Sequence, residues 1–334
     1  MNENKGIQEP REKKGSWWKE VLALLFLSGA VFFFWQQRKE LATLGNSFSH
    51  TNWLWVSIGI LLTIVYILLQ SALYIFSFYS VNGKISLKDA TELFLKRNVM
   101  AVFLPGGGFT ALAYLPNNIR KRQQDANQVH HASVIYGFIG IFSVLIVAIP
   151  VLIFLSVQDT YVPGATAGFI VMLAMLLAIG LFVRSVKVKG PFYKWAIKKR
   201  PKVEKFLVEI FSFDIIWKQF WYATIISILI EIVGVVHLYV AMLSTGLNGS
   251  WTASIVGYIV ATIFLIISPF LRGLGAIEMS LTLILKRYGF NTADALLISL
   301  LFRFFELWLP LITGLFFHLD KVVKPVKKLF IKQG

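Results

Sequence analysis

The sequence contains no cysteine among its 334 residues, and it is poor in charge. Without cysteine, the chain can form neither disulfide bonds nor thiolate metal sites. Only 15% of the residues are charged, whereas 57% are hydrophobic and 15% are aromatic. No stretch poor in apolar residues is long enough for a soluble domain, which argues against an appended catalytic module. This composition predicts an all-α polytopic membrane protein.

Acidic residues are also scarce, with 17 Asp and Glu against 33 Lys and Arg and a formal net charge of +16. The basic residues flank apolar stretches, which indicates loops that face anionic cytoplasmic lipid rather than a nucleic-acid surface. The apolar stretches are longer than barrel strands and lack strict alternation, which disfavours an outer-membrane barrel. We expect a multi-pass protein of the bacterial inner (cytoplasmic) membrane with both termini in the cytoplasm.

Apolar stretches that are long enough to cross a bilayer recur along the chain. The six predicted full spans are residues 21–35, 54–79, 132–155, 165–183, 220–242 and 295–318. They form one transmembrane domain at residues 17–320. Residues 1–16 are a polar tail that we expect to be disordered and cytoplasmic, and residues 321–334 are a basic cytoplasmic tail.

Two further apolar stretches are interrupted by helix-breaking residues and carry charge. Broken backbone at membrane depth must be buried in protein or line a wet cavity, so each stretch predicts a re-entrant helical hairpin. The first hairpin runs through residues 87–100, a segment that carries several charged side chains. The second hairpin lies between the spans at residues 220–242 and 295–318. The predicted hairpin tips contain Pro105, Gly106, Gly107 and Gly108 in the first half and Pro269, Gly273 and Gly275 in the second.

The distribution of basic loops fixes an expected order of these elements. The loop after residue 183 is the most basic and should be cytoplasmic, so the second hairpin must enter and leave from outside. The first hairpin is basic at both ends and should enter from the cytoplasm. The order span, hairpin, span therefore occurs twice with opposite orientation, at about residues 54–156 and 214–318. This pattern is typical of an inverted-repeat transporter.

Ionisable residues inside the apolar stretches are candidates for function, because charge at that depth is costly. Arginine offers a planar fork that suits phosphate, and glutamates can balance it in an empty site. The candidates for binding a head group are Arg272, Glu278, Arg303, Glu306 and Glu231. The structural alternative is that Arg303 and Glu306 form an i,i+3 pair that holds helices together. His237 is interpreted as a hydrogen-bonded packing residue.

The first hairpin offers a candidate cytoplasmic entrance at Glu92, Arg97 and Asn98. An interfacial amphipathic helix is an equally good interpretation of that segment. Gly106 to Gly108 are not followed by the Lys-Ser or Lys-Thr of a phosphate-binding loop. The sequence assigns no catalytic residue, metal ligand or cofactor.

The pattern Ser268-Pro269-x-x-Arg272-Gly273-x-Gly275-x-x-Glu278, followed by Arg303-x-x-Glu306-x-Trp308-x-Pro310, resembles a known family. It is similar to the transmembrane region of lysylphosphatidylglycerol synthase, the flippase-like half of the bacterial multiple peptide resistance factor. The resemblance covers residues 21–318. In the first half, Phe109 to Tyr114 are uncharged where many relatives carry a charge soon after the glycines.

The resemblance implies a flippase or scramblase that moves an anionic or aminoacylated phospholipid, or a lipid carrier, between leaflets. Bifunctional relatives carry a cytoplasmic aminoacyltransferase domain, which we expect this polypeptide to lack. The alternatives are an intramembrane lipid-linked transferase and a membrane partner subunit of a separately encoded aminoacyltransferase. The expected partners are therefore lipid, membrane and such a synthase, with homo-oligomerisation left open and no nucleic acid.

Overall fold

The computed structural model describes residues 51–103, 111–112, 126–157, 165–199, 214–267, 273 and 275–316. Within these ranges the regular structure is entirely helical, which confirms the predicted all-α class. The helices are α3 (Trp53–Tyr79), α4 (Leu87–Phe103), α7 (Ala126–Val157), α8 (Ala165–Lys187), α9 (Pro191–Lys199), α11 (Trp217–Ser244), α12 (Trp251–Ile267), α13 (Ala276–Arg287) and α14 (Thr292–Arg303). A π-helix, η3 (Phe304–Trp308), continues α14, and helix resumes to residue 316.

Five helical stretches are long and apolar enough to cross a membrane. They are Trp53–Tyr79, Gln128–Phe154, Phe169–Val186, Trp217–Ser244 and Thr292–Phe316. Each coincides with a predicted span, so the structure is that of a multi-pass membrane protein. The remaining predicted span, at residues 21–35, lies outside the described residues.

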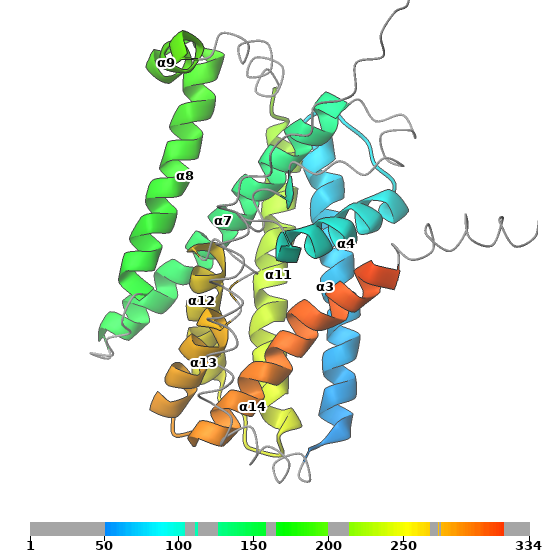
Figure 1. Cartoon of the computed structure of the whole chain (residues 1–334), viewed down its shortest axis with the longest axis vertical. Helices are drawn as coiled ribbons and strands as arrows, with labels where there is room; N and C mark the ends of the chain where they lie inside the picture. Colours follow the sequence, from blue (N-terminus) through cyan, green and yellow to red (C-terminus); the bar gives the residue numbers. More distant parts are fainter. Residues whose placement is uncertain are drawn as a thin grey trace, which may run out of the picture.

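Helix α11 forms the centre of the bundle (Figure 1). It packs against α3, α7, α12 and α14, whereas α8 lies at the edge and contacts α7, α9 and α12. Helices α3 and α11 run antiparallel along their whole length. The Asn52 N–H donates to the Ser244 carbonyl at one end (2.9 Å), and the Ile216 N–H donates to the Ser80 carbonyl at the other (2.9 Å). Side chains that α11 presents at mid-length are therefore surrounded by protein.

Helices α12 and α13 are too short to span a bilayer singly. At about 1.5 Å per residue they extend roughly 25 and 18 Å, against a hydrocarbon thickness of about 30 Å. They pack against each other, and both lie in the lower half of Figure 1. The chain then turns at Gly289 (φ +92°) into α14, whose first turn is capped by the Asn291 side chain accepting from the Asp294 N–H (2.8 Å).

Helix α4 is short and lies beside the last span. Every residue from 92 to 99 is buried, and Val99 and Val102 pack with Leu307 and Leu311. Over residues 92–99 the helix is therefore covered on all sides, whereas Leu87 in its first turn is 52% exposed.

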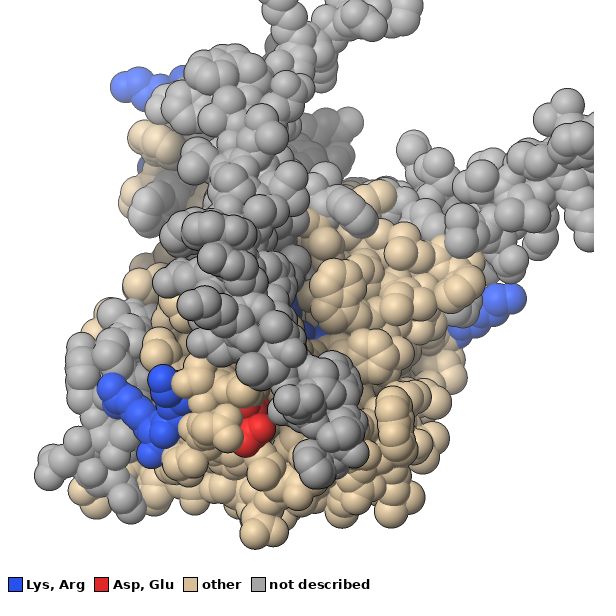
Figure 2. Space-filling model, turned by 60° about the horizontal axis from the view of Figure 1, so that its bottom comes forward, with Lys and Arg blue, Asp and Glu red and all other residues tan. Residues whose placement is uncertain are grey.

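Exposed tryptophans mark the helix ends. Trp53 and Trp251 begin α3 and α12 at one end of the bundle, and Trp217 begins α11 at the other. Tryptophan favours the boundary between hydrocarbon and water, so these positions fit two interfacial belts. Seen with the bottom of Figure 1 turned forward, the described surface is mostly uncharged, with Lys and Arg in several separate places, the largest group at the lower left, and a small acidic patch near the middle (Figure 2).

Candidate functional site

The turn between α12 and α13 depends on two glycines. Gly273 and Gly275 have φ values of +73° and +85°, which side chains other than glycine rarely adopt. The Gly275 N–H then donates to Oε2 of Glu278 in the first turn of α13 (2.6 Å). A carboxylate is favoured there by the partial positive charge of a helix N-terminus. The two glycines of the predicted tip thus direct Glu278 inward.

Glu278 also holds the last span through a buried ion pair. Arg303 Nε donates to Glu278 Oε1 at 2.9 Å, and the two residues are only 4% and 2% exposed. Arg303 lies at the end of α14, so this pair fastens the short helix α13 to the last span. Removing Arg303 would leave the Glu278 carboxylate buried without its cation, which is more costly than removing both charges together.

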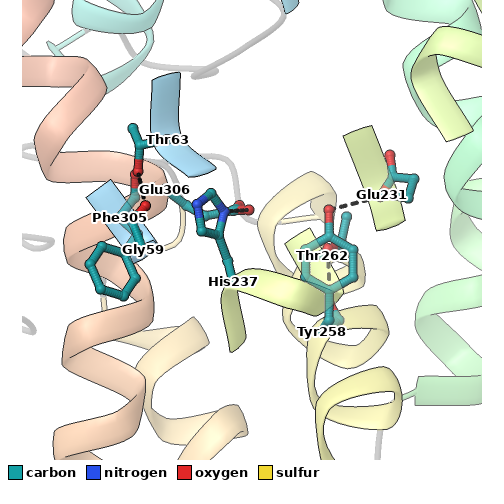
Figure 3. Close-up of polar contacts among 8 residues, drawn as sticks. All are labelled: Gly59, Thr63, Glu231, His237, Tyr258, Thr262, Phe305 and Glu306. Atoms are coloured by element: carbon teal, nitrogen blue, oxygen red, sulfur yellow. Dashed lines mark hydrogen bonds and ion pairs between the residues drawn. The ribbon is translucent and has the colours of Figure 1, made fainter. Parts of the chain in front are cut away.

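Glu306 is paired differently from its neighbour Arg303. Its Oε1 lies 3.2 Å from Nδ1 of His237 on α11, whose side chain is fully buried (Figure 3). The His237 ring stacks on Phe305 and meets Tyr66 edge-on, at centroid distances of 5.8 and 6.3 Å. The other ring nitrogen, Nε2, has no hydrogen-bond partner in the described part of the chain.

A π-helical turn orients Glu306. In η3 the regular i→i−4 backbone bonding is interrupted, and π-turns of this kind occur frequently at functional sites. The Thr63 hydroxyl of α3 donates to the Phe305 carbonyl at 3.0 Å, and to the Gly59 carbonyl of its own helix at the same distance. A Cβ at Gly59 would overlap the Phe305 ring (Figure 3). Close packing of α3 therefore supports the turn that carries Glu306.

Replacing Thr63 by valine should destabilise the protein by about 1–3 kcal/mol, because the buried Phe305 carbonyl would lose a donor. The matched control is Thr224→Val on α11, since the Thr224 hydroxyl donates only within its own helix, to Phe220. Reversible unfolding in mixed detergent micelles measures both variants. Equal losses would contradict a specific role for Thr63 at the π-turn.

Glu231 lies midway along α11 and is 5% exposed. The Tyr258 hydroxyl donates to its Oε2 at 2.9 Å, and the Ser143 hydroxyl donates to its Oε1 at 3.3 Å. Ser143 in turn lies 2.8 Å from Ser227. A Cβ at Gly234 would overlap the Tyr258 ring, so this glycine permits α12 to approach. We name Glu231, His237, Tyr258 and Glu306 the α11 cluster.

The three predicted entrance residues are all buried on α4. Glu92 pairs with Lys96 one turn later. The Arg97 guanidinium lies over the Tyr74 ring, 5.5 Å from its centroid, and donates to the Tyr74 hydroxyl at 3.3 Å. Asn98 is 4% exposed, and neither end of its amide has a hydrogen-bond partner among the described residues. Their role as an entrance stays a prediction.

The structure brings the predicted residues together in two separate ion pairs and one hydroxyl-bound carboxylate. Both residues of the predicted i,i+3 pair make contacts across helices, Arg303 with Glu278 and Glu306 with His237. His237 is hydrogen-bonded, as its interpretation as a packing residue required. Six predicted residues lie outside the described part, namely Pro105, Gly106, Gly107, Gly108, Pro269 and Arg272.

Several residues of this region gave no signal in the sequence. Tyr258, Ser143 and Thr63 are unremarkable members of apolar stretches, and Gly59 is one glycine among 24. Their roles depend on which helix faces which. Among the described residues, no group of three or more His, Cys, Asp or Glu is placed to hold a metal ion.

Comparison with protein families gives a match to the lysylphosphatidylglycerol synthase TM region over residues 21–314. The chain belongs to this family. The match covers every helix described above, apart from the last two residues of the final span, and includes Glu278, Arg303 and Glu306. A comparison with curated proteins returns no match. Membership in the lysylphosphatidylglycerol synthase TM family indicates a lipid-related role in a membrane.

Proposed function

We propose that this protein translocates a phosphate-bearing lipid between the leaflets of the bacterial cytoplasmic membrane. The cargo class is an anionic or aminoacylated phospholipid or a lipid carrier, all of which present a phosphate group. The observation that carries the proposal is the buried pair of Glu278 and Arg303 beside the interrupted helix α12–α13. Charges buried beside broken helices are typical of substrate sites in transporters.

Glu278 occupies the donors that a phosphate would need. Its two oxygens accept from the Arg303 guanidinium and from the backbone N–H of Gly275. Arginine and helix N-termini are both favourable partners for phosphate oxygens. In the proposed cycle, a lipid phosphate replaces the Glu278 carboxylate at Arg303, and Glu278 returns when the lipid leaves. The pair thus keeps an empty site neutral.

The short helices supply the proposed route. Helices α12 and α13 would form a re-entrant hairpin from the outer face, and α4 would form the first leg of a hairpin from the cytoplasmic face. The supporting observations are the length of α12 and α13, and the buried ionisable residues along α4. The two halves, about residues 54–156 and 214–318, would then be inverted repeats within one flippase-like domain at 17–320, with both termini cytoplasmic.

The proposal is tested in liposomes that contain the purified protein and one labelled lipid at a time. We expect a phosphate-bearing lipid to exchange between leaflets faster than in protein-free liposomes, and a neutral glycolipid to exchange at the protein-free rate. Arg272→Ala tests the predicted arginine of the hairpin tip and should reduce the exchange. Absence of exchange for every lipid, with a separate aminoacyltransferase co-purifying, would favour the partner-subunit alternative.

A further inference from the structure

The α11 cluster contains two carboxylates, those of Glu231 and Glu306, each hydrogen-bonded to a side chain from another helix. Glu231 is only 5% exposed, and it receives hydrogen bonds from hydroxyl groups alone in the described part of the chain. A buried carboxylate without a cationic partner is strongly disfavoured unless it binds a proton or a cation. Glu231 is therefore placed where proton binding would relieve a large electrostatic cost.

His237 supplies a second position for a proton. In its neutral form, Nδ1–H can donate to Glu306, which leaves Nε2 as an unoccupied base. Protonation of Nε2 would make the pair of His237 and Glu306 electrically neutral. The His237 side chain is fully buried, so the proton would reach it and leave it through Glu306, whose side chain is 14% exposed.

The charged and titratable groups around the cluster come from each helix that packs against α11. They are Tyr66 on α3, Tyr258 on α12, Arg303 on α14 and Glu306 on η3, while α7 contributes the Ser143 hydroxyl. Arg303 is engaged by Glu278, and the α4 cations Lys96 and Arg97 contact Glu92 and Tyr74. His237 is a basic group that contacts a carboxylate of the cluster, that of Glu306 (Figure 3).

Arg303 connects this cluster to the proposed lipid site. It lies three residues before Glu306 on the same helix. A phosphate bound at Arg303 would bring negative charge within about one helical turn of Glu306, and this charge would favour proton uptake by His237 or Glu231. Phosphate and proton would then bind together and leave together.

We propose that the α11 cluster is a proton-binding site that couples movement of the phosphate-bearing lipid to co-transport of a proton in the same direction. This inference rests on the proposed translocation and supplies its driving force. Glu231 and His237 carry the proton, Tyr258 positions Glu231, and Glu306 links the cluster to Arg303. No bond other than that to the transferred proton forms or breaks.

The test uses proteoliposomes with a labelled phosphate-bearing lipid, a pH-sensitive dye inside and an imposed difference of one pH unit. For one proton per lipid, the steady-state ratio of lipid between leaflets should shift by about tenfold away from the acidic side, since one pH unit is equivalent to a factor of ten in an equilibrium. Lipid movement should be accompanied by a change in the internal pH, which the dye reports. Both effects should disappear in Glu231→Gln and His237→Gln.

Two further variants complete the test. Tyr258→Phe keeps the ring packing and removes the hydroxyl, so it should fold and show a smaller shift. Asp294→Asn removes a carboxylate from the exposed first turn of α14 and should respond like wild type. An unchanged tenfold shift in Glu231→Gln, His237→Gln and Tyr258→Phe would overturn the assignment to this cluster.

The outcomes separate the two proposals. Lipid that equilibrates between leaflets with no response to the pH difference would overturn proton coupling and leave translocation standing. Failure of every phosphate-bearing lipid to exchange, with or without the gradient, would overturn translocation and the coupling with it.

Discussion

Replacing Arg303 by glutamine should lower the free energy of unfolding by about 3–5 kcal/mol, because the Glu278 carboxylate would stay buried without its cation. Glu278→Gln, which removes the carboxylate that Arg303 contacts, should also lower the free energy of unfolding. Both partners are at least 96% buried, so solvent would screen neither remaining charge effectively. Unfolding in mixed detergent micelles measures both changes.

The double variant Glu278→Gln/Arg303→Gln measures how much stability depends on the two charges being present together. It removes both charges and retains amides that can hydrogen-bond, so most of the lost stability should return. The coupling energy in this double-mutant cycle should be large and favourable, as it is for directly contacting residues. Additive losses from the two single variants would show that the pair does not hold α13 to the last span.

The apolar stretches predicted the positions of the helices well, because burial in hydrocarbon imposes the same length on each span. Glu231, Glu278, Arg303 and Glu306 were also identifiable, since charge inside such a stretch is rare. Their partners were not. In a regular helix, residues three apart share a face, which made Arg303 and Glu306 look like a pair. Glu306 instead lies in a π-helical turn, and the two side chains reach different helices.

Gly59→Ala should destabilise the protein by about 1–3 kcal/mol, because the added methyl group would overlap the Phe305 ring. Phe305 is fully buried, so any shift of its ring must displace neighbouring protein atoms. Its displacement would also disturb η3, so the contact between His237 and Glu306 should loosen and lipid exchange should fall. The unfolding midpoint and the exchange rate are measured on the same preparation.

Gly140→Ala on α7 is the matched control. A Cβ at this position meets no atom within 4 Å, and alanine favours a helix over glycine by about 1 kcal/mol. Stability should therefore be unchanged or raised, with exchange at the wild-type rate. Equal effects of the two substitutions would contradict a specific contact between Gly59 and the π-turn.

The sequence also marked the interrupted helices without revealing how their polar residues are used. Proline and glycine predict a break wherever they occur, and Gly273 and Gly275 do adopt the left-handed conformations that require glycine. The inward direction of Glu278 and the burial of residues 92–99 of α4 follow from tertiary packing. No local pattern encodes a contact such as that between Thr63 and Phe305, which lie 242 residues apart.

The central claim is that a lipid phosphate uses Arg303 during translocation. The most direct measurement is leaflet exchange of a phosphate-bearing lipid in liposomes that contain the double variant Glu278→Gln/Arg303→Gln, beside wild type. The double variant should remain folded and inserted, because no unpaired charge is left, and its exchange should fall to the protein-free rate. Exchange at the wild-type rate in this folded variant would contradict the account.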